Sequence, residues 1–194
     1  MQIKYLFFSN RLGFRLWKSA DTSVLAALSS DSEVMKFFPA KFWLNTTSAQ
    51  IYIEKLNEHY DSHGFTYFAV DLLETSQCIG FIGLKTINYH AFFTPAVDIG
   101  WRLAKQFWGK GYATEGAVRC ANWFFESFEE DRFVSITPIQ NSASENVMRK
   151  IGMIKVDEFN HPLLKESDPL ARHVLYEMRA GDQYKLDAEN LRIP

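Results

Sequence analysis

The chain has 194 residues, of which 47% are hydrophobic and 23% are charged, a composition typical of a globular protein with a sizeable core. It has 21 Lys and Arg residues against 23 Asp and Glu, a formal net charge of -2, and no long basic run, so we expect no nucleic-acid partner. No apolar run approaches the ~20 residues that cross a membrane, so we expect no membrane association. The length suggests one domain of ordinary size, or at most two small ones.

The cysteines and histidines give little sign of a disulfide or a metal site. Cys78 and Cys120 lie far apart without C-x-x-C spacing, which indicates reduced thiols in a cytosolic protein. The N-terminal segment has neither the apolar core nor the cleavage site of a signal peptide, so we expect a cytoplasmic location. His59 and His63 have the spacing of a metal pair on a helix, but no third ligand is evident, and we expect no metal.

The first part of the chain predicts one strand and two helices. Alternation over residues 14–20 predicts the strand. Apolar residues at helical spacing over 21–38 predict a helix that Pro39 ends. A second, amphipathic helix follows, capped by Thr46 or Thr47 and stopped by a glycine. Its inward-facing residues would be Ile51, Ile53 and Leu56, and the glycine is Gly64.

The hydrophobic period then changes to two. Residues 65–73 and 78–87 predict a hairpin, and residues 96–105 predict a third strand. Along that strand, Val97, Ile99, Trp101 and Leu103 share one face, and Asp98, Gly100 and Arg102 share the other. Beyond it the pattern predicts a helix over 113–128, a strand over 132–139, a short helix closed by Gly152, and strands over 153–159 and 172–179. This order predicts an α+β fold, with a mixed sheet of about seven strands, and not a doubly wound one.

The segment QFWGKGYATEG, residues 106–116, joins the third of these strands to the next helix. The first turn of a helix has unpaired N–H groups and the positive end of the helix dipole, so such a turn can bind an anion. Gly109 and Gly111 let the backbone approach a ligand, while Lys110 adds a charge and Gln106 a neutral donor. The segment predicts a phosphate or pyrophosphate site, although a plain strand-to-helix turn has the same glycines.

Two common phosphate motifs do not fit this segment. A dinucleotide fingerprint needs a third glycine, but Thr114 occupies that position. A Walker loop needs Ser or Thr after its Gly-Lys pair, but Gly111 follows Lys110. A nucleotide-phosphate binder that uses the same loop in another way is the weaker alternative.

The pattern Gln106-x-x-Gly109-x-Gly111 resembles the acyl-CoA loop Q/R-x-x-G-x-G/A of the GNAT N-acetyltransferases. Further along, NSASENVMRKIGM over 141–153 resembles the second motif of the RimJ/RimL-type branch, N-x-x-S-x-x-V-M-x-K-x-G-M. The two motifs lie on the elements expected for them. The resemblance covers roughly residues 10–179.

The resemblance implies a GNAT-like fold, with a mixed, mostly antiparallel sheet of about seven strands, a central splay and about four flanking helices. This would be one domain over residues 1–194, with a polar tail over 180–194. The implied reaction is acetyl transfer from acetyl-CoA to a primary amine of a small molecule or a protein N-terminus. Gly100 and Trp101 lie where the family's central strand splays and offers backbone N–H groups to the pantetheine and the acetyl oxygen. Such donors typically contribute about 3 kcal/mol in oxyanion sites.

Acetyl-CoA contacts are implied for residues in both motifs and in the preceding strand. They are Trp101, Leu103, Gln106, Trp108, Gly109, Lys110, Gly111, Tyr112, Ala113, Thr114, Asn141, Ser144 and Asn146. Asn141 would bond the pantetheine amides, but its place before a helix also predicts an N-cap. Asn146 has the alternative of a solvated helix residue.

Asp98 is the candidate base that would take a proton from the amine, directly or through water. Its alternative is a structural carboxylate or one that anchors the substrate. Many relatives place a Tyr acid on the helix after the Asn motif, but Met148 occupies that position here. Ser144 is therefore the candidate acid, with an ordinary contact to pantetheine as its alternative.

Phe37, Phe38 and His161 are the candidate acceptor-site residues, because their segments cover the acceptor in relatives. The alternative for each is a purely structural place. Nothing in the sequence selects among small-molecule and peptide amines, and a homodimer is compatible with the family. A function of another class, a non-catalytic acyl-CoA-binding sensor, would keep the glycine loop without the chemistry, and the absence of a Tyr at Met148 allows it.

Overall fold

The computed structural model describes residues 4–182, so most of the polar tail predicted over 180–194 lies outside the described residues. An eight-stranded sheet runs in the order β1-β2-β3-β4-β5-β6-β8-β7, and every neighbouring pair is antiparallel except the parallel pair of β5 and β6. The strands are β1 (Phe7–Phe8), β2 (Leu12–Arg15), β3 (Tyr67–Leu72), β4 (Cys78–Thr86), β5 (Val97–Leu103), β6 (Arg132–Pro138), β7 (Ile154–Asn160) and β8 (Arg172–Arg179). The α-helices are α1 (Thr22–Ser30), α2 (Thr46–His63), α3 (Tyr112–Ser127) and α4 (Ser142–Lys150), with short 3-10 helices η1 (Ser19–Asp21), η2 (Ala40–Phe42) and η3 (Lys105–Phe107). The predicted α+β class is confirmed, with eight strands in place of about seven.

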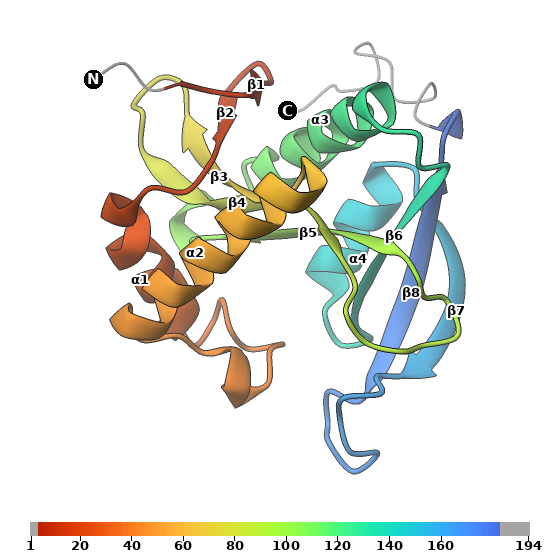
Figure 1. Ribbon diagram of the computed structural model, residues 1–194. Helices are drawn as coiled ribbons and strands as arrows, with labels where there is room; N and C mark the ends of the chain where they lie inside the picture. The colour runs from red at the N-terminus through yellow and green to blue at the C-terminus, as the bar shows by residue number, and fades with distance from the viewer. Residues whose placement is uncertain (1–3, 183–194) are drawn as a thin grey trace.

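The helices cover both faces of the sheet (Figure 1). Phe68 and Val70 of β3 belong to a core cluster that includes Phe124 of α3. Ala69, which lies between them in the chain, belongs to a second cluster that includes Ile53 of α2. Because side chains alternate along a strand, β3 separates two cores, one under α3 and the other under α1 and α2.

The N-terminal part differs from the single strand predicted over 14–20. A hairpin of β1 and β2 ends at Arg15, and the chain then enters η1 at Ser19. Between them, Trp17 is 3% exposed and donates from Nε1 to the carbonyl of Tyr67 at 2.7 Å. Leu16 continues the apolar alternation of Leu12 and Phe14 beyond the end of the strand, which is why the pattern predicted the wrong boundaries.

Helix α1 ends at Ser30 and does not continue to residue 38 as predicted. Asp31 has an extended backbone, with φ -72° and ψ 117°, and its Oδ1 accepts the backbone N–H of Glu33 at 2.8 Å. A local bond from an Asp side chain to the backbone competes with helix formation. The chain therefore turns after α1 and brings Phe37 and Phe38 to the wall of the cavity described below.

Helix α2 follows its predicted course except at its cap. Asn45, and not Thr46 or Thr47, is the N-cap, because its Oδ1 accepts the backbone N–H of Ser48 at 2.9 Å. Gly64 ends the helix in the left-handed region with φ 80°, as predicted. Of the residues expected to face inward, Ile53 and Leu56 are buried, whereas Ile51 is 48% exposed and that prediction was wrong.

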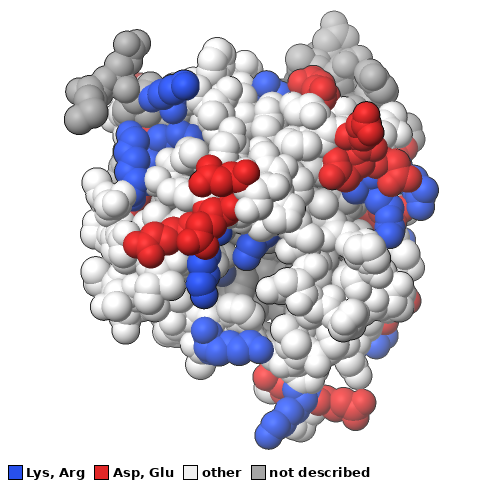
Figure 2. Space-filling model, in the orientation of Figure 1, with Lys and Arg blue, Asp and Glu red and all other residues white. Residues whose placement is uncertain are grey.

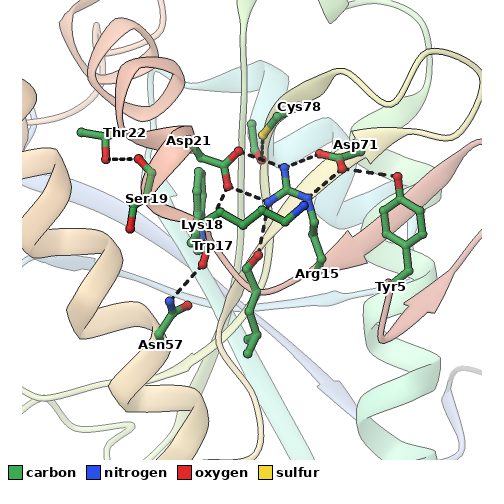
Figure 3. A network of polar contacts seen from close by, with 12 residues as sticks. Tyr5, Arg15, Trp17, Lys18, Ser19, Asp21, Thr22, Asn57, Asp71 and Cys78 are labelled. Carbon is green, nitrogen blue, oxygen red and sulfur yellow. Dashed lines mark hydrogen bonds and ion pairs between the residues drawn. The ribbon is translucent and has the colours of Figure 1, made fainter. Parts of the chain in front are cut away.

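A buried ionic network ties the N-terminal hairpin to the sheet (Figure 3). The guanidinium of Arg15 donates to Asp21 at 2.6 and 3.0 Å and to Asp71 at 2.7 and 2.8 Å. The hydroxyl of Tyr5 donates to Asp71 at 3.3 Å. Burial opposes the charge of Arg15, but its bonds to the two carboxylates outweigh burial and raise its pKa. The network therefore holds β2, η1 and β3 together through one cation.

Candidate active site

A cavity of about 720 Å³ is lined by β5, β6, the starts of α3 and α4, and the segment after α1. Its volume lies in the range of small-molecule sites. The predicted site residues that line it are Asp98, Ser144, Trp101, Leu103, Trp108, Gly109, Gly111, Tyr112, Ala113, Thr114, Asn141, Asn146, Phe37, Phe38 and His161. Gln106 and Lys110 are exposed and are not part of its wall, and Nζ of Lys110 lies 5.7 Å from the ring centroid of Phe107.

Strands β5 and β6 separate along the cavity. Their one register pair is Asp98 with Val134, whereas β5 stays paired with β4 as far as Leu103. Beyond that pair, the hydroxyl of Ser135 donates to the carbonyl of Ile99 at 2.8 Å. The splay expected at residues 100 and 101 is thus present, because β5 has lost its parallel neighbour there.

The separation leaves backbone N–H groups of β5 turned toward the cavity. The N–H of Ala104 donates to the carbonyl of Ile79 on β4 at 2.9 Å. Since N–H directions alternate along an antiparallel ladder, the N–H groups of Trp101 and Leu103 point to the other side, where β6 has moved away. The carbonyl of Leu103 is occupied, because it accepts Nε1–H of Trp108 at 2.7 Å. At Leu103 the free backbone group is therefore the donor.

A glycine turn closes one end of the cavity. Gly109 has φ 73° and Gly111 has φ 79°, in the left-handed region that glycine favours. A Cβ on Gly109 would meet no atom of the described residues within 4 Å, so its backbone conformation, and not lack of space, calls for glycine. Gly111 is the N-cap of α3, no side chain of the described residues caps that helix, and its first bond runs from the N–H of Glu115 to Gly111. The N–H groups of residues 112–114 are thus left for an anion.

The start of α4 forms the opposite wall. Asn141 is the N-cap, with Oδ1 accepting the backbone N–H of Ser144 at 3.3 Å and Nδ2 donating to Thr137 at 2.9 Å and to Oγ of Ser144 at 3.1 Å. Since Oγ of Ser144 accepts here, its own proton remains available to donate into the cavity. Asn146 is exposed and accepts from Arg149 at 2.7 Å. The N-cap alternative for Asn141 is what the structure shows.

Asp98 has a partner that sequence reasoning missed. The hydroxyl of Tyr67 donates to Oδ2 of Asp98 at 2.5 Å. Tyr67 pairs with Gly83 of β4, and Gly83 pairs with Gly100 of β5, so two glycines lie in line with the phenol across three strands. A Cβ on Gly100 would lie 3.2 Å from the Tyr67 hydroxyl. The two glycines were the only sign in the sequence of this contact between Tyr67 and Asp98, and only the strand register shows that they are aligned.

The carboxyl group of Asp98 titrates near neutral pH. Burial raises its pKa to about 7, and the bonds from Tyr67 and from the backbone of Ile136, with the charge of Lys85, only limit that rise. Burial and the charge of Asp98 raise the pKa of Tyr67 well above its usual value, so Tyr67 remains a donor. A carboxylate with such a pKa can take up and release protons under physiological conditions.

His161 lies in the cavity wall beside Tyr89 and His173, with ring centroids 4.9 Å away in both cases. Its Nδ1 accepts the backbone N–H of Leu163 at 3.2 Å, so a neutral ring carries its proton on Nε2. Burial and the neighbouring His173 lower the pKa of His161 to about 4. His161 is therefore a neutral hydrogen-bond donor at pH 7.

Further polar side chains that sequence reasoning missed also line the cavity: Tyr52, Lys85, Tyr89 and Arg102. Lys85 is the cross-strand partner of Asp98. The hydroxyl of Tyr89 is buried and has no hydrogen-bond partner within the described part of the chain. No spacing rule indicates these residues, because each comes from a different element and they meet only through packing.

Within residues 4–182, no group of three or more His, Cys, Asp and Glu side chains is placed to hold a metal ion. His59 and His63 stack with ring centroids 4.2 Å apart, and their Nδ1 atoms lie 2.8 and 3.1 Å from backbone carbonyls. Both cysteines are free thiols. No helix in this part of the chain is long and apolar enough to cross a membrane.

Comparison with known proteins places these features in a family context. The family model described as an acetyltransferase (GNAT) domain matches residues 11–154. The uncharacterized N-acetyltransferase p20 of Bacillus licheniformis is 24% identical over 148 residues, which are 76% of this chain and 82% of the relative.

Two solved structures show the same fold at low identity. The ribosomal-protein-S5-alanine acetyltransferase of Vibrio fischeri superposes with a TM-score of 0.72 at 20% identity, covering 91% of this chain and 97% of that one. The spermidine N-acetyltransferase of Vibrio cholerae, solved with CoA and spermine, has a TM-score of 0.72 at 14% identity and covers 90% of this chain and 98% of its own. At such identities the likeness concerns the fold, and the acceptors named for the two neighbours differ.

Proposed function

The chain belongs to the GNAT acetyltransferase family, and from this premise we propose that it transfers an acetyl group from acetyl-CoA directly to a primary amine of a small molecule or a protein N-terminus. The observation that carries the proposal is that one cavity contains the splay of β5, the glycine turn before α3 and the carboxylate of Asp98. These features would serve as an acyl-group site, an anion site and a proton acceptor within the same cavity.

The residues present fit acetyl-CoA as the co-substrate. The uncapped start of α3, with positive φ at Gly109 and Gly111, offers several N–H groups to a pyrophosphate. The N–H groups of Trp101 and Leu103 supply donors for the pantetheine and for the acetyl oxygen. When bound, acetyl-CoA supplies an activated thioester carbonyl. The chain thus orients both reactants with backbone groups, which demands few special side chains.

Asp98 is the proposed base. An amine with its ordinary pKa near 10 is mostly protonated at pH 7, so a group must accept its proton before it attacks. With a pKa of about 7, Asp98 is partly ionised at neutral pH and matched to that task. Tyr67 fixes the carboxylate by its 2.5 Å bond to Oδ2.

Ser144 is the proposed donor to the departing thiolate. Its Oγ already accepts from Asn141, so its proton is free to point into the cavity. Met148, where many relatives carry a Tyr acid, is buried beside it. A serine hydroxyl is a weak acid, so we expect Ser144 to orient and hydrogen-bond the sulfur more than to protonate it fully.

A panel of primary amines tests the proposal. The protein is incubated with acetyl-CoA and each amine, and free thiol and acetylated amine are measured together. We expect equal amounts of the two products for at least one amine, and only slow thiol release without an amine. Binding of acetyl-CoA without transfer to any amine would favour the sensor alternative.

A further inference from the structure

Arg102 occupies an unusual place at the acceptor side of the cavity. It lies on β5, on the same face as Asp98 and Gly100, and lines the cavity. Its guanidinium carbon lies 4.1 Å from the ring centroid of Phe38 and 5.2 Å from that of Phe81. Two aromatic rings thus hold the planar group and leave its N–H edge for other partners.

That N–H edge is poorly occupied. Nη1 donates to Oγ of Ser29 at 3.4 Å, which is a long bond, and Nε is buried without a hydrogen-bond partner in the described part of the chain. Among residues 4–182, no carboxylate lies within salt-bridge distance of Arg102. By contrast, Arg15 uses the same group to bond two carboxylates. Arg102 is half-buried, and a guanidinium that is partly removed from water without a counter-charge is stabilised when an anion joins it.

The cavity as a whole carries an excess of positive charge. Its lining cations are Lys36, Lys41, Lys85, Lys150 and Arg102, and its lining anions are Glu33 and Asp98. In Figure 2, the hollow near the middle of the visible face is bordered by Lys and Arg side chains. Such a lining attracts an anionic ligand and repels a polycation.

Arg102 is separated from the proposed base. Four residues along one strand place the Cα atoms of Asp98 and Arg102 roughly 13 Å apart. The phenols of Tyr52 and Tyr67 both interact electrostatically with Asp98 and with Arg102. Burial raises the pKa of each phenol, Asp98 raises it further, and Arg102 lowers it. A ligand that contacts both Asp98 and Arg102 would therefore extend past these two tyrosine rings.

We propose that Arg102 binds an anionic oxygen group of the acceptor, a carboxylate or a phosphate, so that the substrate is an amine carrying such a group several bonds from its nitrogen. The placement of the amine at Asp98 rests on the proposed function. The guanidinium fork between Phe38 and Phe81 suits either anion, because both present two oxygens in a plane.

Four acceptors of similar length test the proposal with the wild-type protein: aminocaproate, aminohexyl phosphate, aminohexanol and cadaverine. We expect kcat/KM for at least one of the two anionic amines to exceed that for aminohexanol by roughly tenfold or more, the fold-change of a charge-assisted bond. Cadaverine, with a second positive charge, should be the poorest. Which anion is preferred distinguishes a carboxylate from a phosphate. Equal or better use of aminohexanol or cadaverine would overturn the proposal.

Substitutions of Arg102 separate recognition from a merely structural role. In Arg102→Gln the ratio of kcat/KM between the preferred anionic amine and aminohexanol should fall to about one, whereas Arg102→Lys should keep part of it, since the charge remains. Arg179→Gln removes the same charge on a mostly exposed side chain outside the cavity and should leave the ratio unchanged. If Arg102→Gln lowers both rates equally, Arg102 only supports the fold.

The two proposals fail in different ways. Thermal melting with each of the four compounds, in the presence of CoA, measures binding without transfer. If no amine is acetylated but the anionic compounds alone raise the Tm, the proposed function fails and the anion site stands. If amines are acetylated without preference for an anion, the function stands and the anion site is rejected. If the anionic compounds neither raise the Tm above aminohexanol nor react better, the anion site is also rejected.

Discussion

At the scale of single residues, the chemistry depends on how Asp98 is surrounded. A carboxylate on a strand ordinarily titrates far below neutral pH. Here burial raises its pKa to about 7, while the bond from Tyr67 keeps the ionised form accessible. The space for that bond exists because Gly100 has no Cβ. A base suited to neutral pH thus results from burial, which a bond from a neighbouring phenol partly offsets.

Asp98→Asn tests this base. Because only the ionised carboxylate accepts a proton, protonation of Asp98 should lower the wild-type kcat/KM as the pH drops below about 7. The pH–rate profile of the Asn variant should lack this contribution. We expect the variant to be roughly a hundredfold slower at pH 8, as for loss of a general base. A pH–rate series measured with saturating acetyl-CoA shows both effects. The exposed Asp157, replaced by Asn, is the matched control.

The same substitution has an expected effect on stability. The raised pKa means that the folded protein holds the Asp98 proton while the unfolded chain loses it between about pH 4 and pH 7. Stability from this group therefore declines as the pH rises through that window, and Asn does not titrate. We expect the Tm of Asp98→Asn relative to wild type to be higher at pH 8 than at pH 4. A constant difference would contradict the assigned pKa.

At the scale of elements, the glycine turn and the start of α3 act as one unit. The strand β5 ends at Leu103, η3 turns the chain, and Gly111 begins the helix with a left-handed residue. No charged side chain is required for an anion to be held there, which agrees with the exposed position of Lys110 outside the cavity. The proposed anion site is thus formed by three successive elements and not by one residue.

Gly111→Asp should abolish acetyl-CoA binding, because it places a negative charge against the N–H groups at the start of α3. Acetyl-CoA at about 100 times its Kd should stabilise the wild type by ~2.7 kcal/mol, a Tm rise of roughly 5–10 °C. The variant should melt as a folded protein but show no rise. Gly181→Asp, at another positive-φ glycine outside the cavity, controls for backbone strain and should keep the rise. An undiminished rise in Gly111→Asp would refute the site.

At the scale of the whole molecule, two cores lie on opposite faces of one sheet, and the cavity opens where the sheet parts. The face that carries α1 and α2 supplies Arg102 and Tyr67, and the start of α3 closes one end of the cavity. The ionic network of Figure 3 joins the N-terminal hairpin to this arrangement through Arg15. The network thus bonds Asp71 of β3, the strand that also carries Tyr67.

Asp71→Asn should destabilise the whole molecule. An amide in place of this fully buried carboxylate turns an N–H group toward the donors of Arg15 and leaves part of the guanidinium unpaired. Breaking a buried ionic partnership costs about 3 kcal/mol, which chemical denaturation can measure. Glu126→Gln, which removes the partner of Arg119 in an exposed ion pair, should change the free energy of unfolding far less. Equal effects of the two changes would contradict the structural weight given to the network.

Much of the architecture follows from local patterns. The hydrophobic pattern over residues 78–87 and 96–105 predicted β4 and β5 to within two residues, because β5 has one apolar face and β4 is an apolar run buried on both faces. The positive φ at Gly109 and Gly111 agrees with the turn predicted from QFWGKGYATEG. The end of α1 was mispredicted, since the Asp31 side chain bonds the backbone and overrides helical periodicity.

The sequence by itself determined the class of fold, the order of the elements after the N-terminal hairpin and the glycine turn before α3, since periodicity and glycine conformation act over a few neighbouring residues. Only the tertiary structure decided which polar groups meet. Tyr67 reaches Asp98 through the register of three strands, and Arg102 lies between Phe38 and Phe81 because separate segments pack there. The pKa of Asp98 and the lack of a counter-ion at Arg102 depend on burial and on distances across the fold. Both are set only when distant segments of the chain pack together.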